Sequence, residues 1–294
     1  MSILFSHWSF DPIAIVVAAI VALHARGQTA RIRDASARGS GTSALVSQTA
    51  LFYAGLLVLL VAVMSPLDYW ADDYLFIHMI QHIILAFFAP QLIVLGAPWL
   101  ALLRGLPISA RRRCGRGVRG VRRNARLMRA WSAVSGPVPA IVAFNAAMIF
   151  WHLPGPFDYA AKHPLVHIWL EHGSFFGFGV AFWLQMLESR PFKPALAPMG
   201  RAAALLGTNV VMVIIAMTLA MFTGPVYAVY AHVQGAAFSQ ANDQQLGAAV
   251  LWVCGDLTIA PTLLYNLRIW MTAEDRAEEA RAAALVRRAQ GARA

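Results

Sequence analysis

Residues 74–95 read YLFIHMIQHIILAFFAPQLIVL, a stretch that contains no Lys, Arg, Asp or Glu. A helix rises about 1.5 Å per residue, so a run of this length can cross the roughly 30 Å hydrocarbon core of a bilayer. The chain has 294 residues, of which 59% are hydrophobic and 13% charged. A soluble domain of this length rarely combines so much apolar content with so little charge. The stretch therefore predicts a span of a helical membrane protein.

Further apolar runs of similar length extend this prediction to an all-α fold with seven transmembrane helices. The predicted spans are 11–25 (beginning as early as residue 3), 46–64, 74–95, 131–151, 165–187, 201–222 and 246–270. Helices are expected because a spanning segment must satisfy its own backbone polar groups, and no alternating barrel pattern is present. We expect residues 1–271 to form one transmembrane domain and residues 272–294 a charged, helical tail.

The basic residues orient this domain. Of 24 Lys and Arg, all but Lys162 lie in the connectors 25–47, 104–130 and 188–201 or in the tail from Arg268. By the positive-inside rule, the N-terminus lies outside and the C-terminus in the cytoplasm. We expect the arginine-rich connector 104–130 to lie against anionic headgroups. Nucleic acid is not an expected partner, because that connector has no interleaved aromatic residues on which bases could stack.

Two histidines of the quoted stretch are candidate metal ligands. His78 and His82 are four residues apart, so both rings project from one face of the helix, in its outer half. Ionisable groups inside a bilayer are costly and usually functional. The alternative role is hydrogen bonding to a neighbouring helix.

The fifth predicted span carries three further candidates just below its outer end. His167 and Glu171 are expected to share a helix face, whereas His172 is displaced by about 140° at 3.6 residues per turn. On this geometry one ligand set cannot easily use all three. Glu171 could fix the tautomer of a ligand histidine or belong to a proton path.

Sulfur ligands and outlying groups complete the candidate set. Met217 and Met221 end the sixth span at a similar depth, and thioether with imidazole suits Cu(I). His152, at the outer end of the fourth span, and His232, in the outer connector 223–245, could cap the site or move the metal. Asp256, near the midplane of the seventh span, indicates a proton or cation path or a salt bridge.

These residues fall within a pattern that resembles the CtaG family of membrane proteins, which is associated with assembly of caa-type cytochrome c oxidase. The matching stretches are SPLD (65–68), HMIQH (78–82), AP (89–90), LGAP (95–98), WHLP (151–154), Asp158, HP (163–164), His167, EH (171–172) and DQQL (243–246) leading to Trp252. The likeness covers about residues 50–270. One departure is Cys254-Gly255-Asp256, where we expect Pro-Gly after the seventh-span Trp.

The resemblance implies a seven-helix assembly factor of the bacterial cytoplasmic membrane, without enzymatic activity, that supplies copper to the oxidase. Its expected partners are oxidase subunits, the lipid bilayer and a periplasmic copper chaperone. Copper is expected to bind from the periplasmic side through His78 and His82, with His167, His172, His152, Met217 and Met221. Transfer by ligand exchange predicts ligands that are exposed near the surface.

Two alternatives use the same residues differently. In a b-type haem electron carrier, His82 would pair with His167 or His172, but no second histidine pair lies in the opposite leaflet. A copper permease would use Asp256, yet the inner leaflet offers only His24 to continue a pathway. Hydrolytic and nucleotide-dependent functions have no support, because the sequence contains none of the motifs typical of them.

Overall fold

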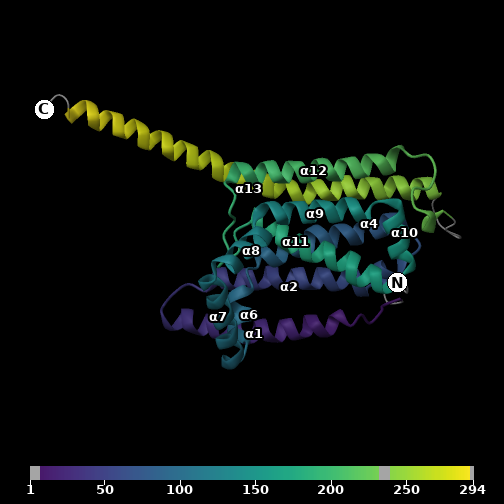
Figure 1. The fold of residues 1–294 in the computed structure, drawn as a ribbon, viewed down its shortest axis with the longest axis horizontal. Coiled ribbons are helices and arrows are strands. Elements are labelled where there is room, and N and C mark those ends of the chain that lie inside the picture. Colours follow the sequence, from purple (N-terminus) through teal and green to yellow (C-terminus); the bar gives the residue numbers. More distant parts are fainter. Residues whose placement is uncertain (1–6, 232–238, 292–294) are drawn as a thin grey trace.

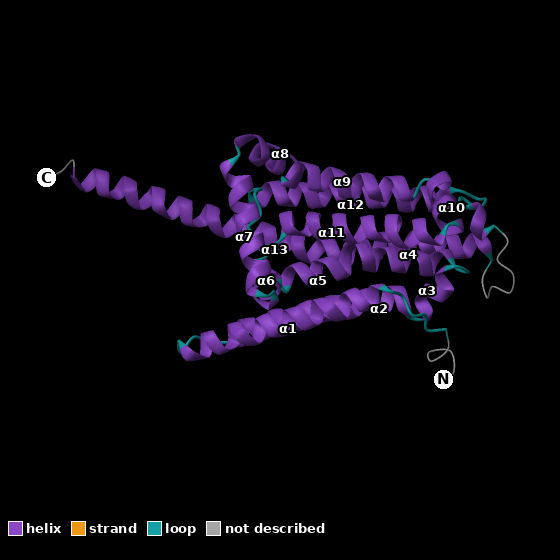
Figure 2. Cartoon of the chain, turned by 60° about the horizontal axis from the view of Figure 1, so that its bottom comes forward, coloured by secondary structure: helices purple, strands orange, loops and turns teal. Residues whose placement is uncertain are grey.

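Nearly parallel helices form one bundle with two distinct ends (Figures 1 and 2). The computed structural model describes residues 7–231 and 239–291. Its α-helices are α1 (Ile13–Ala37), α2 (Ser43–Met64), α3 (Pro66–Ala71), α4 (Leu75–Ile83), α5 (Ala89–Leu95), α6 (Trp99–Gly105), α7 (Ile108–Arg123), α8 (Ala125–Ser135), α9 (Pro137–Trp151), α10 (Pro154–Lys162), α11 (Gly173–Met186), α12 (Pro198–Met221) and α13 (Gln240–Gly291). Two π-helical segments, η1 (Ile84–Phe88) and η2 (Val166–His172), and a 3-10 turn, η3 (Ala228–Tyr230), complete the described elements. The all-helical prediction is confirmed for this part of the chain.

Five of the described helical stretches are long and apolar enough to cross a membrane: Ile13–Ala37, Ser43–Met64, Leu75–Leu95, Pro198–Met221 and Gln240–Ala284. A sixth arises if α8 and α9 count as one span bent by 43°. These apolar stretches indicate a multi-pass membrane protein. Seven spans, and their orientation, stay a prediction.

The irregular spans have identifiable causes. Gly136 is extended (ψ 170°) and precedes Pro137, which starts a new helix, so the predicted span 131–151 is broken there. The third span runs on through η1 into α5, and Pro90 follows η1 closely. Proline cannot donate a backbone hydrogen bond, and a π-turn relieves the clash of its ring with the preceding turn.

The core brings α4, η1, α9 and α11 together in the middle of the bundle, with α1 and α2 on one side and α12 and α13 on the other (Figure 1). The helices of the core approach one another closely where small residues lie between them, as is usual for membrane helices. A Cβ on Gly179 of α11 would lie only 2.6 Å from the Ala86 carbonyl oxygen of η1. The charged tail continues α13 without a break and projects away from the bundle (Figure 1).

We call one end of the bundle the histidine end, where α3, α10 and η3 lie, and the other the arginine end, where α6 and α7 lie (Figure 2). The N-terminus of α4 is fixed at the histidine end by Asp243 of α13. Its two carboxylate oxygens accept hydrogen bonds from the backbone N–H groups of Leu75 (2.9 Å) and Phe76 (3.0 Å). A helix start leaves such N–H groups without intrahelical partners, so this carboxylate sets where α4 begins.

Candidate metal centre

A buried group of five histidines and one glutamate lies at the histidine end. It consists of His78, His82, His152, His167, His172 and Glu171, contributed by α4, the end of α9 and η2. We call it the histidine cluster. His167 is half-buried and the other five side chains are buried, with His82 at 0% exposure. So many polar groups at one place within an apolar bundle require partners, because an unpaired buried polar atom is costly.

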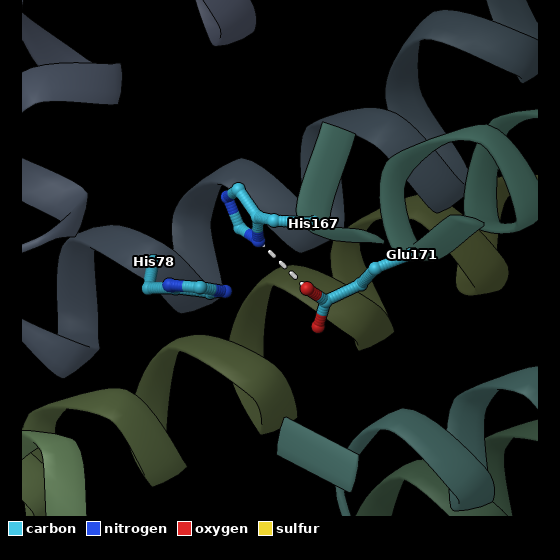
Figure 3. A group of neighbouring side chains, drawn as sticks. All are labelled: His78, His167 and Glu171. Atoms are coloured by element: carbon cyan, nitrogen blue, oxygen red, sulfur yellow. Dashed lines mark hydrogen bonds and ion pairs between the residues drawn. The ribbon is translucent and has the colours of Figure 1, made fainter. Parts of the chain in front are cut away.

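The closest contacts lie within α4 and within η2, and the two elements meet where His82 Nε2 lies 3.3 Å from Glu171 Oε1. His78 Nε2 lies 2.8 Å from His82 Nε2, and His167 Nδ1 lies 2.7 Å from Glu171 Oε2. The ligand atoms of His78, His167 and Glu171 all lie within 4.8 Å of one another, and Figure 3 shows these three side chains facing a common point. A metal–nitrogen or metal–oxygen bond is about 2.0–2.2 Å long, so two ligands of one ion lie at most about 4.4 Å apart. The three ligand atoms are therefore almost close enough to bind a single ion as they stand.

Tyr230 of η3 determines the tautomer of His78. Its hydroxyl lies 2.6 Å from the Ala71 carbonyl oxygen, to which it donates, and 2.9 Å from His78 Nδ1. Burial raises the pKa of Tyr230 well above its usual range, so the phenol keeps its single proton. With that proton on Ala71, the hydroxyl accepts from the Nδ1–H of His78, so His78 Nε2 carries a lone pair that accepts from the Nε2–H of His82 at 2.8 Å. A cation bound at His78 Nε2 would take the place of that proton.

Several buried atoms of the cluster have no hydrogen-bond partner: His82 Nδ1, His152 Nε2, His172 Nε2 and Glu171 Oε1. Glu171 Oε1 does lie 3.3 Å from His82 Nε2, but the contact is not aligned as a hydrogen bond. Most buried polar atoms in folded proteins are paired, so four such atoms in one cluster indicate a site for an additional polar or cationic species. A ligand set made mostly of imidazoles, with one carboxylate, suits copper or zinc, whereas Mg²⁺ prefers oxygen ligands.

The predicted displacement of His172 is wrong. Its ring centroid lies 4.1 Å from that of His167 and 6.1 Å from that of His82, so the three belong to one cluster. The cause is η2, in which hydrogen bonds join residues five apart, so His167 and His172 fall near the same side of the helix. A regular α-helix would separate them, which is the geometry that the sequence suggested.

The ligands are also less accessible than ligand exchange at a surface predicts. Phe157 of α10 stacks on Tyr227 (centroids 3.8 Å apart) and lies 4.9 Å from the His78 ring. Asp158 ties α10 to η3, since its carboxylate oxygens accept from the backbone N–H groups of Ala228 (3.1 Å) and Val229 (3.2 Å). We call α10 and η3 together the cap; it packs over the cluster at the histidine end of the bundle.

Other predicted residues lie elsewhere. Met217 and Met221 are 38% and 72% exposed on α12, so the structure does not bring this pair into the cluster. Asp256 accepts a hydrogen bond from the Asn209 amide of α12, a partner that the sequence did not reveal, and lines a groove on the side of the bundle. His232 lies outside the described residues.

Sequence reasoning missed the residues that support the cluster. These include Tyr230, Asp158 and Asp243, described above. In addition, the Gln81 amide donates to the Ala62 carbonyl (2.8 Å) and to Asp68 (2.7 Å), which holds α4 against α2 and α3. Gln244 holds the connector after α12 through its amide, which donates to the carbonyls of Leu219, Phe222 and Gly224. Gln81, Asp243 and Gln244 were signalled only by their place in the quoted stretches HMIQH and DQQL. Asp158 was signalled only by its place in the family pattern, and Tyr230 had no signal in the sequence.

Comparison with known proteins identifies the family of this chain. The model of one protein family, described as cytochrome c oxidase caa3 assembly factor (Caa3_CtaG), matches residues 28–273. The chain belongs to this family. No curated protein and no solved structure matches it. The matched region includes every residue of the histidine cluster, both helices that carry most of it, and the cap.

Proposed function

We propose that this CtaG-family protein binds a copper ion as cargo in the histidine cluster and passes it to a cytochrome c oxidase during assembly. Family membership supports the role in oxidase assembly. The observation that supports copper is the convergence of five histidines and Glu171, with four polar atoms lacking partners, at one buried place. Such a role is one of binding and transfer rather than catalysis.

The proposed ligands are His78, His82, His167 and Glu171, with His152 and His172 near enough to take part in exchange. Stepwise replacement of one imidazole by another would let the ion move without ever being free in an apolar medium. Positive charge in the connectors at the arginine end supports a periplasmic position of the cluster, since basic connectors of membrane proteins favour the cytoplasmic side. A periplasmic copper chaperone would then deliver the ion, and an oxidase subunit would accept it.

The haem alternative is less well supported by the packing. His82 contacts Phe175 (centroids 4.7 Å apart), and His78 lies against Phe157, so apolar rings fill the flanks of the cluster where a porphyrin would need space. The permease alternative depends on Asp256. This carboxylate already accepts a hydrogen bond from Asn209 and lines a groove on the side of the bundle, so it gives little support to a pathway through the bundle.

The test is elemental analysis for copper, zinc and iron on detergent-purified protein after anaerobic Cu(I) loading and desalting. We expect about one equivalent of copper in the native chain and almost none in the double variant His78→Ala/His82→Ala. His163→Ala is the matched control, since that histidine is exposed and stacks on Tyr159. Circular dichroism checks that the double variant keeps its helices.

Each result has a direct meaning. Copper lost only from the double variant, with a matching fall in the copper content of the oxidase in cells that carry it, supports delivery. Iron in the native chain supports the haem alternative. Neither metal, or copper retained by the double variant, would overturn the proposal and leave the histidines a packing or docking role.

A further inference from the structure

At the arginine end, a separate pocket of about 280 Å³ opens between α1, α6 and the start of α2. Its lining residues are Arg31, Ala35, Arg38, Leu45, Leu100 and Arg104. We call it the arginine pocket. Three guanidinium groups and a few apolar side chains form its walls, and no residue of the histidine cluster is among them. It therefore differs in both place and chemistry from the candidate metal centre.

Two glycines fix the arginines in place by letting α1 and α6 touch. A Cβ on Gly27 would lie 1.8 Å from the Ala101 carbonyl oxygen, and a Cβ on Gly105 would lie 2.0 Å from the Leu23 carbonyl oxygen. Neither helix can therefore carry a larger residue at the crossing. Arg31 lies one turn beyond Gly27, and Arg104 is next to Gly105. The backbone contact thus holds the two arginines at one pocket, and Figure 1 shows α6 crossing α1 at this end.

The pocket keeps an excess of positive charge. Arg104 pairs with Asp34 (2.7 Å), whereas Arg31 donates only to the uncharged Gln28 (2.9 Å). The backbone N–H of Arg38 donates to Ala35, but its guanidinium group has no hydrogen-bonding or ion-pairing partner among the described residues. Gln28 is itself held by hydrogen bonds from its amide to the Leu45 carbonyl and the Thr49 hydroxyl, both 2.9 Å. Two guanidinium groups thus face the same space without an acidic partner, which favours an anion.

We propose that the arginine pocket binds the phosphate group of an anionic phospholipid of the cytoplasmic leaflet. Guanidinium groups bind phosphate oxygens through paired, charge-assisted hydrogen bonds. Leu45 and Leu100 supply apolar walls beside the charges, as the glycerol and first acyl carbons of a lipid require. Basic pockets between membrane helices on the cytoplasmic side are typical sites for such headgroups. A soluble phosphate would use the same arginines but not the apolar walls.

The pocket differs from the rest of the basic surface at this end. Arg112 and Arg116 of α7 are exposed and line no described pocket, so they attract anionic lipid only as a diffuse charge. The double variant Arg112→Gln/Arg116→Gln therefore removes the same charge as Arg31→Gln/Arg38→Gln without touching the pocket. Arg104 is left intact in both, because its pairing with Asp34 links α6 to α1.

The experiment is native mass spectrometry of the full chain, delipidated in detergent and then titrated with phosphatidylglycerol, cardiolipin, phosphatidylethanolamine or inorganic phosphate. We expect one anionic phospholipid to be retained, and the apparent affinity to fall by about tenfold or more in Arg31→Gln/Arg38→Gln. The control double variant should stay close to the native chain. Copper retention at the histidine end should be unchanged in both, which checks that the fold is intact.

Three outcomes would overturn the proposal. Equal loss of lipid in both double variants would mean that only diffuse charge is recognised. Equal retention of phosphatidylethanolamine would remove the requirement for an anionic lipid. Competition by inorganic phosphate that displaces the lipid at equal concentration would make a soluble phosphate the ligand.

Discussion

The two ends of the bundle solve the problem of holding charge in a membrane protein in opposite ways. At the histidine end, groups that can be neutral are buried together and four of their polar atoms have no hydrogen-bond partner, so a bound cation would be desolvated and held by short contacts. At the arginine end, permanently charged groups stay near water and are placed by contact between two backbones. The difference teaches that burial suits a ligand held by coordination, whereas a partly open pocket suits one held by charge.

The sharpest way to break this comparison is to change the one acidic member of the histidine cluster. Glu171→Gln keeps the shape of the side chain but removes its charge, so His82 and His167 lose an anionic partner. We expect copper affinity to fall by about 10–100-fold, the usual effect of losing a carboxylate that orients or supplements ligand histidines. Competition with a chromophoric Cu(I) chelator measures it.

Glu188→Gln is the matched control, because this residue follows α11 at the other end of the same helical segment. Affinity unchanged by Glu171→Gln would mean that the carboxylate serves only packing, and the contrast between the two ends would then rest on the histidines alone.

Binding at the two ends should also differ in its dependence on salt, by a smaller factor. Raising sodium chloride from about 0.05 to 0.5 M shortens the screening length in water to a few ångströms and weakens exposed charge pairs most. We expect retention of anionic lipid at the arginine pocket to drop several-fold while copper affinity stays within about twofold. Parallel titrations of one preparation test this. Equal sensitivity at both ends would show that burial is not what distinguishes them.

Weakening the cap should change the rate of copper release more than the affinity for copper. Asp158→Ala removes two hydrogen bonds between α10 and η3, and a net loss of about 1 kcal/mol corresponds to about a fivefold faster opening. Release of copper to an excess of chelator, followed by stopped flow, should accelerate by roughly that factor. Asp73→Ala is the control, because Asp73 is exposed in the connector between α3 and α4 at the same end of the bundle. An unchanged release rate would mean that the ion leaves by another route.

The smallest expected effect concerns the exposed methionines. Replacing both Met217 and Met221 with leucine keeps the volume and removes the sulfur atoms, and neither side chain is in the histidine cluster. Copper affinity should therefore stay within about twofold, measured by the same chelator competition as for Glu171→Gln. A tenfold loss would restore the methionines as ligands and extend the site along α12 toward the lipid.

How far the sequence predicts this molecule depends on what each inference needs. Helical class and the approximate bounds of the apolar stretches follow from length and hydropathy, and His78 with His82 follows from the four-residue spacing of a regular helix. The sequence does not say which helices are neighbours. Met217 and Met221 share the depth of the histidines but not their face of the bundle, so depth alone misplaced them.

The remaining errors come from local irregularity and from contacts across the chain. His172 was misplaced because nothing in residues 166–172 signals a π-helical turn. Tyr230 binds His78 across 152 positions, and Asp243 caps α4 across 168, so neither role has a local signature. Burial of the ligands under the cap likewise depends on how α10 and η3 pack, which hydropathy does not report.

The π-helical segment η2 has a genetic consequence. A π-turn holds about one residue more than an α-turn, so its effect depends on the number of residues and not on their identity. Inserting one codon among Ile168, Trp169 and Leu170 would leave every histidine and Glu171 in the protein. His167 and His172 would then be six residues apart, about 120° from each other around an α-helix, and a π-turn would not bring them onto one face either. We expect such an in-frame insertion to abolish copper retention, which would show that a binding centre can be lost, or gained, by a change in length alone.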